Sequence, residues 1–408
     1  MRIGEFAVKN NTTIDTIRHY MDLSLLIPGK VGPYYEFDSN CQKDYDTILS
    51  LKHIGFTLAE IQTLMLYERI GRHTEYSRKK TYRAFFYNKL LWIEEELYRL
   101  NSMKDRLQDT LKSMPLESGH SHPQSGVPFK ALPLLYCNEC GTSYVLSEGQ
   151  VENGQVISGK LTCSCENSLK IRDGILYGKG ALHHDMCDDI GDTFIDDYVK
   201  TTHVDYLKNL FMSLQWARNN YAFSDHKDGV ILELGSGRGF FLRNVIDLLS
   251  KDSLYIAVDH NPRSQAWLKE SLADVIGNGN ILFLCCDFKT IPLRPESLAA
   301  MIDATGSSNY AFEHEDFLLD SLVDLLADGS TIYGHYLVFK NFAFNSIIPE
   351  KSRKWFKKES VKDQLAVLGF NHLKEYETSP ISQGGPRESF FVEGEKIFNY
   401  LYIGKLCR

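Results

Sequence analysis

The sequence has 408 residues, too many for one ordinary hydrophobic core, and this length predicts two to three domains. Its hydrophobic content of 43% and charged content of 24% are typical of a globular protein, and no apolar run approaches the ~20 residues that a membrane span needs. Residues 1–113 contain 17 basic and 15 acidic residues, a net charge of +2. The remaining residues contain 28 basic and 38 acidic residues, a net charge of −10, so the C-terminal part is poorly suited to binding nucleic-acid phosphates.

The first residues, MRIGEFAVKNNTT, lack the apolar stretch of a signal peptide. We therefore expect a cytoplasmic protein with no membrane partner. The chain contains nine cysteines, and in a reducing compartment closely spaced pairs of them favour metal binding over disulfides.

Residues 1–72 are predicted to form a small helical domain. The stretch RIGEFAVKNNTTIDTIRHYMDLSLLIP has helical spacing in two short pieces, and Thr12 or Thr13 in the turn between them can cap the second helix. Two short helices across a tight turn make a helix-turn-helix. The stretch GKVGPYYEFD then predicts a wing, and CQKDYDTILSLKHIGFTLAEIQTLM predicts a further helix pair. A helical domain without a ligand is the alternative.

Taken together, RIGEFA, TIDTIRHYMDLSLLIP, PYYEFD and LKHIGFTLAEI resemble the MerR family of bacterial transcription regulators over about residues 1–70. The resemblance implies a winged helix-turn-helix that docks its recognition helix in the major groove of promoter DNA. The residues expected to face DNA are Thr13, Thr16, Arg18, His19, Tyr20, Tyr34 and Tyr35. Asp15, His19 and Tyr35 differ from the family's usual residues and weaken phosphate contacts, which leaves the operator sequence open.

Residues 75–114 are predicted to form one long helix, because residues 77–114 contain no proline or glycine. Apolar residues in steps of three and four form a seam of about four heptads, typical of a coiled coil. The seam consists of Phe86, Leu90, Ile93, Leu97, Leu100, Leu107 and Leu111, with Lys104 in the gap. Such a helix would outrun a small domain, which favours a homodimer over packing on its own chain. The MerR resemblance also implies dimerisation here, through an antiparallel helix, and a near-palindromic operator. The basic stretch ERIGRHTEYSRKK just before the long helix either contacts DNA phosphates or is simply exposed to solvent.

Residues 115–131 are rich in proline, glycine and serine and are predicted to be a linker.

In residues 132–180, Cys137 and Cys140 form a C-x2-C pair, and Cys163 and Cys165 form a C-x-C pair. Four thiolates from two turns suit a structural Zn²⁺ site, and buried cysteines without metal are the alternative. The stretch GKLTCSCENSLKIRDGIL resembles the zinc ribbon of some ribosomal-RNA guanine methyltransferases. LHHDMCDD (residues 182–189) is either a second metal cluster or, as we favour, an exposed linker.

Residues 190–408 alternate strand and helix patterns, which predicts a doubly wound parallel sheet. The stretch VILELGSGRGFF reads as a strand, a turn with Gly235, Gly237 and Gly239, and a helix start. Three acidic residues lie in or at the ends of the first three strands: Glu233, Asp259 and Asp287. We expect FFVEGEKIFNYLYIGKL to complete the sheet edge.

By position, this pattern resembles the class I S-adenosylmethionine-dependent methyltransferases. The resemblance implies that the three glycines let the backbone approach the cofactor, that Asp259 binds the ribose, and that Asp287 and Phe288 frame the adenine. A domain for another nucleotide is the alternative. Asp303, Tyr310, His314 and His335 are candidates for lining an acceptor pocket, although each is equally compatible with ordinary packing.

Together these features predict a dimeric, MerR-like regulator whose methyltransferase domain methylates an unidentified acceptor, serves as the effector-sensing module, or does both. Two alternatives remain. One is a sensor that binds S-adenosylmethionine without turnover, and the other is a zinc-ribbon RNA methyltransferase, conferring drug resistance, whose DNA-binding head controls its own gene.

Overall fold

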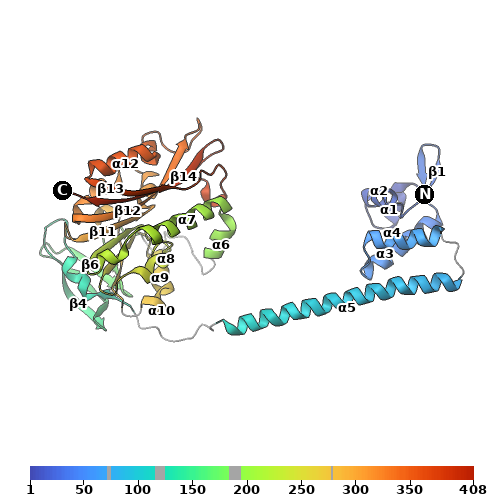
Figure 1. Cartoon of the computed structure of the whole chain (residues 1–408), viewed down its shortest axis with the longest axis horizontal. Helices are drawn as coiled ribbons and strands as arrows, with labels where there is room; N and C mark the ends of the chain where they lie inside the picture. Colours follow the sequence, from blue (N-terminus) through green and yellow to red (C-terminus); the bar gives the residue numbers. More distant parts are fainter. Residues whose placement is uncertain (71–74, 115–124, 183–193, 277–278) are drawn as a thin grey trace. The chain divides into compact units, whose positions relative to one another are not determined.

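The computed structural model describes residues 1–70, 75–114, 125–182, 194–276 and 279–408 (Figure 1). The chain divides into two compact units, Met1–Gly119 and His120–Arg408. Within the described ranges, every helix is too short or too polar to cross a membrane. All but the first residue of LHHDMCDD lies outside these ranges.

The N-terminal unit contains the predicted elements in the predicted order. They are α1 (Ile3–Lys9), α2 (Ile14–Asp22), the antiparallel hairpin of β1 (Gly29–Val31) and β2 (Tyr34–Glu36), α3 (Ser39–His53), α4 (Leu58–Ile70) and α5 (Glu75–Ser113). The hydroxyl of Thr13 caps α2 by accepting a hydrogen bond from the backbone N–H of Thr16 at 3.1 Å. The centre of the core is formed by the fully buried side chains of Phe6, Ile17, Ile48 and Leu64.

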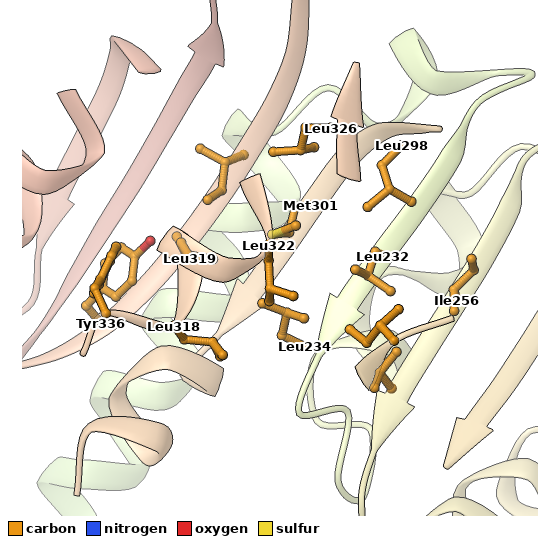
Figure 2. Close-up of a cluster of buried hydrophobic side chains, with 14 of the residues drawn as sticks. Leu232, Leu234, Ile256, Leu298, Met301, Leu318, Leu319, Leu322, Leu326 and Tyr336 are labelled. Atoms are coloured by element: carbon orange, nitrogen blue, oxygen red, sulfur yellow. The ribbon is translucent and has the colours of Figure 1, made fainter. Parts of the chain in front are cut away.

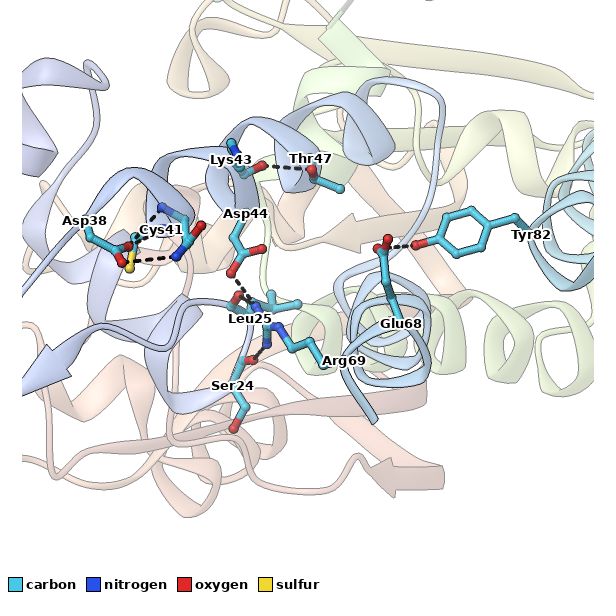
Figure 3. A network of polar contacts seen from close by, with 11 residues as sticks. Ser24, Leu25, Asp38, Cys41, Lys43, Asp44, Thr47, Glu68, Arg69 and Tyr82 are labelled. Atoms are coloured by element: carbon cyan, nitrogen blue, oxygen red, sulfur yellow. Dashed lines mark hydrogen bonds and ion pairs between the residues drawn. The ribbon is translucent and has the colours of Figure 1, made fainter. Parts of the chain in front are cut away.

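Arg69, near the end of α4, ties three parts of this unit together (Figure 3). Its guanidinium donates hydrogen bonds to the carbonyl oxygens of Ser24 and Leu25, both at 2.6 Å. It also forms an ion pair with Asp44 of α3 at 2.6 Å. Because one planar guanidinium serves several acceptors at once, this side chain fixes the loop after α2 against α3 and α4.

Helix α5 has 39 residues and is therefore ~58 Å long. Its first half is fastened to α4: Tyr82 donates a hydrogen bond to Glu68 at 2.6 Å (Figure 3), and Lys89 pairs with Glu60 at 3.0 Å. Further along, the predicted seam is exposed to solvent in the single chain, with Leu97 55% and Leu107 65% exposed. The helix therefore presents a long apolar stripe beyond its contact with the head.

The C-terminal unit is built on one long mixed sheet. Its strands are β3 (Val127–Pro128), β4 (Val145–Glu152), β5 (Gln155–Thr162), β6 (Ser168–Arg172), β7 (Ile175–Tyr177), β8 (Val230–Leu234), β9 (Leu254–Asp259), β10 (Ile281–Cys285), β11 (Leu298–Ala304), β12 (Leu326–Asn341), β13 (Phe370–Glu377) and β14 (Lys396–Leu406). They lie in the order β13-β14-β12-β11-β8-β9-β10-β7-β6-β5-β3, and β4 pairs with β5.

The parallel strands β10-β9-β8-β11-β12 form the centre, and the chain order reverses between β8 and β11. This is the order of a doubly wound sheet, in which ligands bind beside the reversal at the carboxyl ends of the strands. Two expectations were wrong. The sheet is not all parallel, because β14 is antiparallel to β12 and β13, and β14 is not the edge, because β13 lies outside it. The sequence FNHLKEYE of β13 is mostly polar and exposed, so its pattern did not indicate a strand.

The helices of this unit cover both faces of the sheet. They are α6 (Phe194–Thr201), α7 (Val204–Asn220), α8 (Leu242–Val245), α9 (Pro262–Ser271), α10 (Ala273–Ile276), α11 (Gly306–Ala311) and α12 (Lys358–Val367). Because strand side chains alternate between faces, the sheet forms two cores. One contains Leu232, Leu234, Ile256, Leu298, Met301, Leu318, Leu319, Leu322, Leu326 and Tyr336 (Figure 2), and the other packs under α7, α8 and α9.

The predicted linker, residues 115–131, is too long at its C-terminal end. Val127 and Pro128 already pair with β5, and Ala131 is fully buried in the short 3-10 helix Phe129–Leu134. The composition of this stretch predicted a flexible linker. Its small apolar side chains can also pack against the sheet, which the composition alone did not reveal.

Candidate functional site

The glycine turn follows β8 at the point where the strand order reverses. Gly235, Gly237 and Gly239 have φ values of +68°, +47° and +69°, a region that side chains other than glycine adopt only with strain. A Cβ on Gly235 or Gly237 would meet no atom closer than 3.5 Å, so at these two positions the positive φ, and not a lack of space, favours glycine. A Cβ on Gly239 would lie 2.2 Å from Leu268, so this glycine lets the turn pack against α9.

Asp259 ends β9 beside this turn. Its Oδ2 accepts a hydrogen bond from the N–H of Gly237 at 2.9 Å, and its Oδ1 accepts one from the N–H of Asn261 at 2.8 Å. Asn261 in turn caps α9 through its side chain. Burial raises the pKa of the Asp259 carboxyl. One carboxylate thus joins the glycine turn to the start of α9 and faces the same edge of the sheet.

Glu233 lies beneath the turn rather than at its surface. Its side chain is buried, and Tyr255 donates a hydrogen bond to its Oε2 at 3.0 Å. Burial raises the pKa of this carboxyl to about 8. The structure therefore gives Glu233 a place behind the turn, where it supports β8 and β9.

Asp287 and Phe288 follow β10, which ends two residues earlier than predicted. The carboxylate of Asp287 is exposed and accepts a hydrogen bond from the N–H of Lys289 at 2.8 Å. The ring of Phe288 reaches the glycine turn, with Cζ 3.6 Å from where a Cβ of Gly235 would lie. The residues predicted to hold the cofactor thus gather at the carboxyl ends of β8, β9 and β10.

The turn after β11 also lies next to Gly235. Gly306 lies with its Cα 3.5 Å from the Cβ position of Gly235, and Thr305 before it has a φ of +70°. Asp303 is buried beneath this turn, where its Oδ1 accepts a hydrogen bond from the N–H of Ser307 at 2.8 Å. Burial raises the pKa of the Asp303 carboxyl to about 6. The sequence reasoning did not single out Gly306, although the dipeptide Thr-Gly at a strand end is a turn signal.

The other acceptor candidates have contacts of their own. The ring of Tyr310 stacks on His314 at 3.8 Å between centroids, and the Tyr310 hydroxyl donates a hydrogen bond to Asp316. His335 is buried, and burial lowers its pKa to about 4. Asp303 lies beside Tyr336, and adjacent residues of a strand point to opposite faces, so His335 belongs to the other face.

Two cavities flank the cofactor edge. One, of about 470 Å³, is lined by Asn138, Tyr144, Lys170, Lys179 and Lys289 among others, and one of about 320 Å³ includes Phe288 in its lining. Neither contains a residue of the glycine turn.

The four predicted metal ligands come together. The Sγ atoms of Cys137, Cys140, Cys163 and Cys165 all lie within 4.8 Å of one another, with 3.8 Å between Cys137 and Cys165. Tetrahedral Zn²⁺ with bonds of ~2.3 Å holds its sulfurs ~3.8 Å apart, so the four thiols fit such an ion. Hydrogen bonding from the Thr142 side chain lowers the pKa of Cys140 to about 5, which favours the thiolate that a metal binds.

On the N-terminal unit, most of the residues predicted to face DNA are accessible. Arg18 and His19 are exposed on α2 and Tyr34 and Tyr35 on the hairpin, whereas the Thr13 hydroxyl is used as the helix cap. Arg18 pairs with Asp15 at 3.3 Å, so its charge is partly balanced within α2.

Tyr20 was wrongly predicted to face DNA. It is 3% exposed, because its position three residues after Ile17 places both side chains on the core face of α2. Its ring packs near Tyr45, and its hydroxyl accepts a hydrogen bond from Lys52 at 3.3 Å.

Residues 1–68 match the family model described as MerR HTH family regulatory protein, which confirms the predicted resemblance of the head. The sequence matches no curated protein. Solved structures that resemble the C-terminal unit include the MccD protein (13% identity, 48% of this chain, 96% of that chain, TM-score 0.38). A second is a putative sarcosine dimethylglycine methyltransferase from Galdieria sulphuraria (13% identity, 48% of this chain, 86% of that chain, TM-score 0.36). A third is a putative methyltransferase from Bacillus halodurans (10% identity, 49% of this chain, 100% of that chain, TM-score 0.36).

The cysteine cluster predicts a zinc content that depends on its four thiols. Purified protein should contain about one Zn²⁺ per chain, and Cys140→Ser should lose most of it because a three-thiolate site binds more weakly. Cys407→Ser, which removes an exposed cysteine outside the cluster, is the matched control and should keep its zinc. Metal analysis by mass spectrometry makes the comparison. Equal zinc in both variants would contradict the assignment.

The buried Glu233 predicts a pH-dependent stability. Because its pKa is raised from 4.5 to about 8, the folded protein keeps a proton that the unfolded chain releases between these values. Stability should therefore fall by ~3 kcal/mol as the pH rises from 5 to 8. Glu233→Gln keeps a neutral side chain and should reduce this loss, whereas Glu148→Gln, at an exposed position of β4, should not. Calorimetric unfolding across this pH range tests the prediction, and a parallel pH profile for Glu233→Gln and the wild type would refute it.

Proposed function

We propose that this protein is a dimeric transcription regulator with a MerR-like DNA-binding head and a C-terminal unit that binds S-adenosylmethionine and transfers its methyl group. The match of residues 1–68 supports the first half. The exposed side chains of α2 and of the hairpin would contact promoter DNA, as a recognition helix and a wing do.

One observation carries the second half: the hydrogen bond from Gly237 N–H to Asp259 in a turn of three positive-φ glycines. This turn stands beside the strand reversal, where a doubly wound sheet binds its ligand. A carboxylate at this place can accept hydrogen bonds from two adjacent ribose hydroxyls, and the backbone of Gly235 and Gly237, which carries no side chain, can lie against the rest of the cofactor. A sheet of this order with an antiparallel strand next to its edge is also the arrangement of class I methyltransferases.

The residues present fit a methyl transfer that relies on positioning. The cofactor supplies a sulfonium methyl group, whose bond to sulfur breaks as the bond to a nucleophile of the acceptor forms, leaving S-adenosylhomocysteine. Phe288 and the turn at Gly306 both lie next to Gly235 and would help to hold cofactor and acceptor in line. Because alignment alone can supply much of the rate, no catalytic acid or base is required.

The dimer is supported by the exposed seam of α5. Leu97, Leu100, Leu107 and Leu111 are each at least 49% exposed, a large apolar surface for a single helix. Pairing with the same helix of a second chain would bury it and set two heads for a near-palindromic operator. The occupancy of the C-terminal unit could then bias the two heads only if the two states of the dimer differ in affinity for the cofactor.

Cofactor binding can be measured by calorimetric titration with S-adenosylmethionine. The wild type should bind, and Asp259→Ala should bind 10- to 100-fold more weakly, because hydrogen bonds to a charged group contribute about 1.5–3 kcal/mol. Asp252→Ala, in an exposed acid just before β9, is the control and should bind as the wild type does. Equal affinity in all three proteins, or no binding, would sink the proposal. Binding without formation of S-adenosylhomocysteine in the presence of cell extract would favour the sensor alternative.

Dimerisation can be measured by analytical ultracentrifugation. The wild type should sediment as a dimer, and Leu97→Lys with Leu107→Lys should shift it to a monomer that selects no DNA from a random library. Lysines at Glu94 and Asp105, exposed positions of the same helix, control for added charge. A monomeric wild type would contradict the proposal.

A further inference from the structure

The cysteine segment is part of the same sheet as the cofactor site. Strand β7, its last strand, pairs in parallel with β10, the strand that leads to Asp287. Strand β6, which begins three residues after Cys165, pairs with β7. The C-x-C pair is therefore connected to β10 through only two strands.

Beyond β7, the chain crosses the carboxyl ends of β10 and β9. The N–H of Gly178 donates a hydrogen bond to the carbonyl of Cys285 at 2.9 Å. The carbonyl of Lys179 accepts hydrogen bonds from the N–H of Asp287 at 3.0 Å and from the Thr290 hydroxyl at 2.7 Å.

This part of the chain ends beside Asp259, whose carboxylate is predicted to bind the ribose. The N–H of Leu182 donates a hydrogen bond to the carbonyl of His260, the residue after Asp259, at 2.9 Å. We call residues Gly178 to Leu182 the crossing segment. It thus extends from Asp287, which is predicted to contact the adenine, to the residue after Asp259, which is predicted to bind the ribose.

The crossing segment packs closely against Cys286 and Asp287, which follow β10. A Cβ on Gly180, whose φ is +76°, would lie 2.6 Å from the Cβ of Asp287. A Cβ on Gly178 would lie 2.9 Å from the Cβ of Cys286. Any side chain at these two positions would push the segment away from the loop that carries Asp287.

The C-x2-C pair is fastened to the same loop from the other side. The side chain of Asn138, between the two cysteines, donates a hydrogen bond to the carbonyl of Ile291 at 3.1 Å. The N–H of Tyr136 donates one to the carbonyl of Pro292 at 2.9 Å. Both halves of the cysteine cluster are thus attached to residues 285–292, which comprise the last residue of β10 and the loop after it.

We propose that the crossing segment forms the outer wall of the adenine side of the cofactor site, and that a soft divalent cation in the cysteine cluster holds this wall in place. The proposal rests on the proposed binding of S-adenosylmethionine. With the cation bound, the two cysteine pairs and the loop at Asp287 form one rigid unit. Without it, the bonds that join the two cysteine pairs through the metal are lost, and ordering the wall then reduces the free energy of cofactor binding.

The test compares the affinity of the full-length protein for S-adenosylmethionine when loaded with Zn²⁺, after chelation, and after Zn²⁺ is restored. Chelation should weaken binding at least tenfold, and added Zn²⁺ should restore it. Hydrogen exchange should show faster exchange in residues 178–182 and 286–292 of the zinc-free protein, while β8, β11 and β12 stay protected.

A variant separates the wall from the metal. Gly180→Val should keep its zinc and weaken cofactor binding at least tenfold, whereas Gly154→Val, in the β4–β5 turn with no atom within 4 Å of its Cβ, should leave affinity unchanged. Equal affinity with and without Zn²⁺ in a folded protein overturns the inference alone. If chelation unfolds the sheet, unchanged affinity in Gly180→Val overturns it. A zinc-loaded protein that binds no cofactor overturns the proposed function and this inference together.

Discussion

The proposed site in the C-terminal unit depends on the carboxylate of Asp259, which accepts hydrogen bonds from two backbone N–H groups. By bonding Gly237 it fixes a turn whose φ values favour glycine, and by bonding Asn261 it fixes the start of α9. Helix α9 then packs Leu268 into the space that Gly239 leaves open. A single charged group thus links the ends of β8 and β9, and it does so at the edge where a doubly wound sheet binds its ligand.

Much of this could be predicted from the sequence, because its signals are local. The glycine spacing and the acid at the end of the next strand indicated the turn and Asp259, and the four cysteines are brought together as their spacing suggested. In the head, the polar residue before Ile14 marked the start of α2 correctly. Each of these signals depends on a few residues near one another in the chain.

The failures have a common cause: they depend on contacts between distant parts of the chain. Tyr20 has a polar hydroxyl and lies on a helix rich in polar residues, yet α3 covers it through Tyr45 and Lys52. The polar strand β13 exists because β14 offers it a ladder of backbone hydrogen bonds. The glycines at 178 and 180 carry no pattern of their own, and their place against residues 286 and 287 follows from the pairing of β7 with β10.

The two units have different roles in the proposed regulator. The exposed polar side chains of α2 would contact DNA, and the buried carboxylate beside the glycine turn would hold a cofactor. The central claim concerns the second. A crystal structure of the protein with S-adenosylhomocysteine tests it most directly. The account predicts both ribose hydroxyls within hydrogen-bond distance of the Asp259 carboxylate and the homocysteine moiety against Gly235 and Gly237. Ligand bound elsewhere, with that carboxylate untouched, would contradict it.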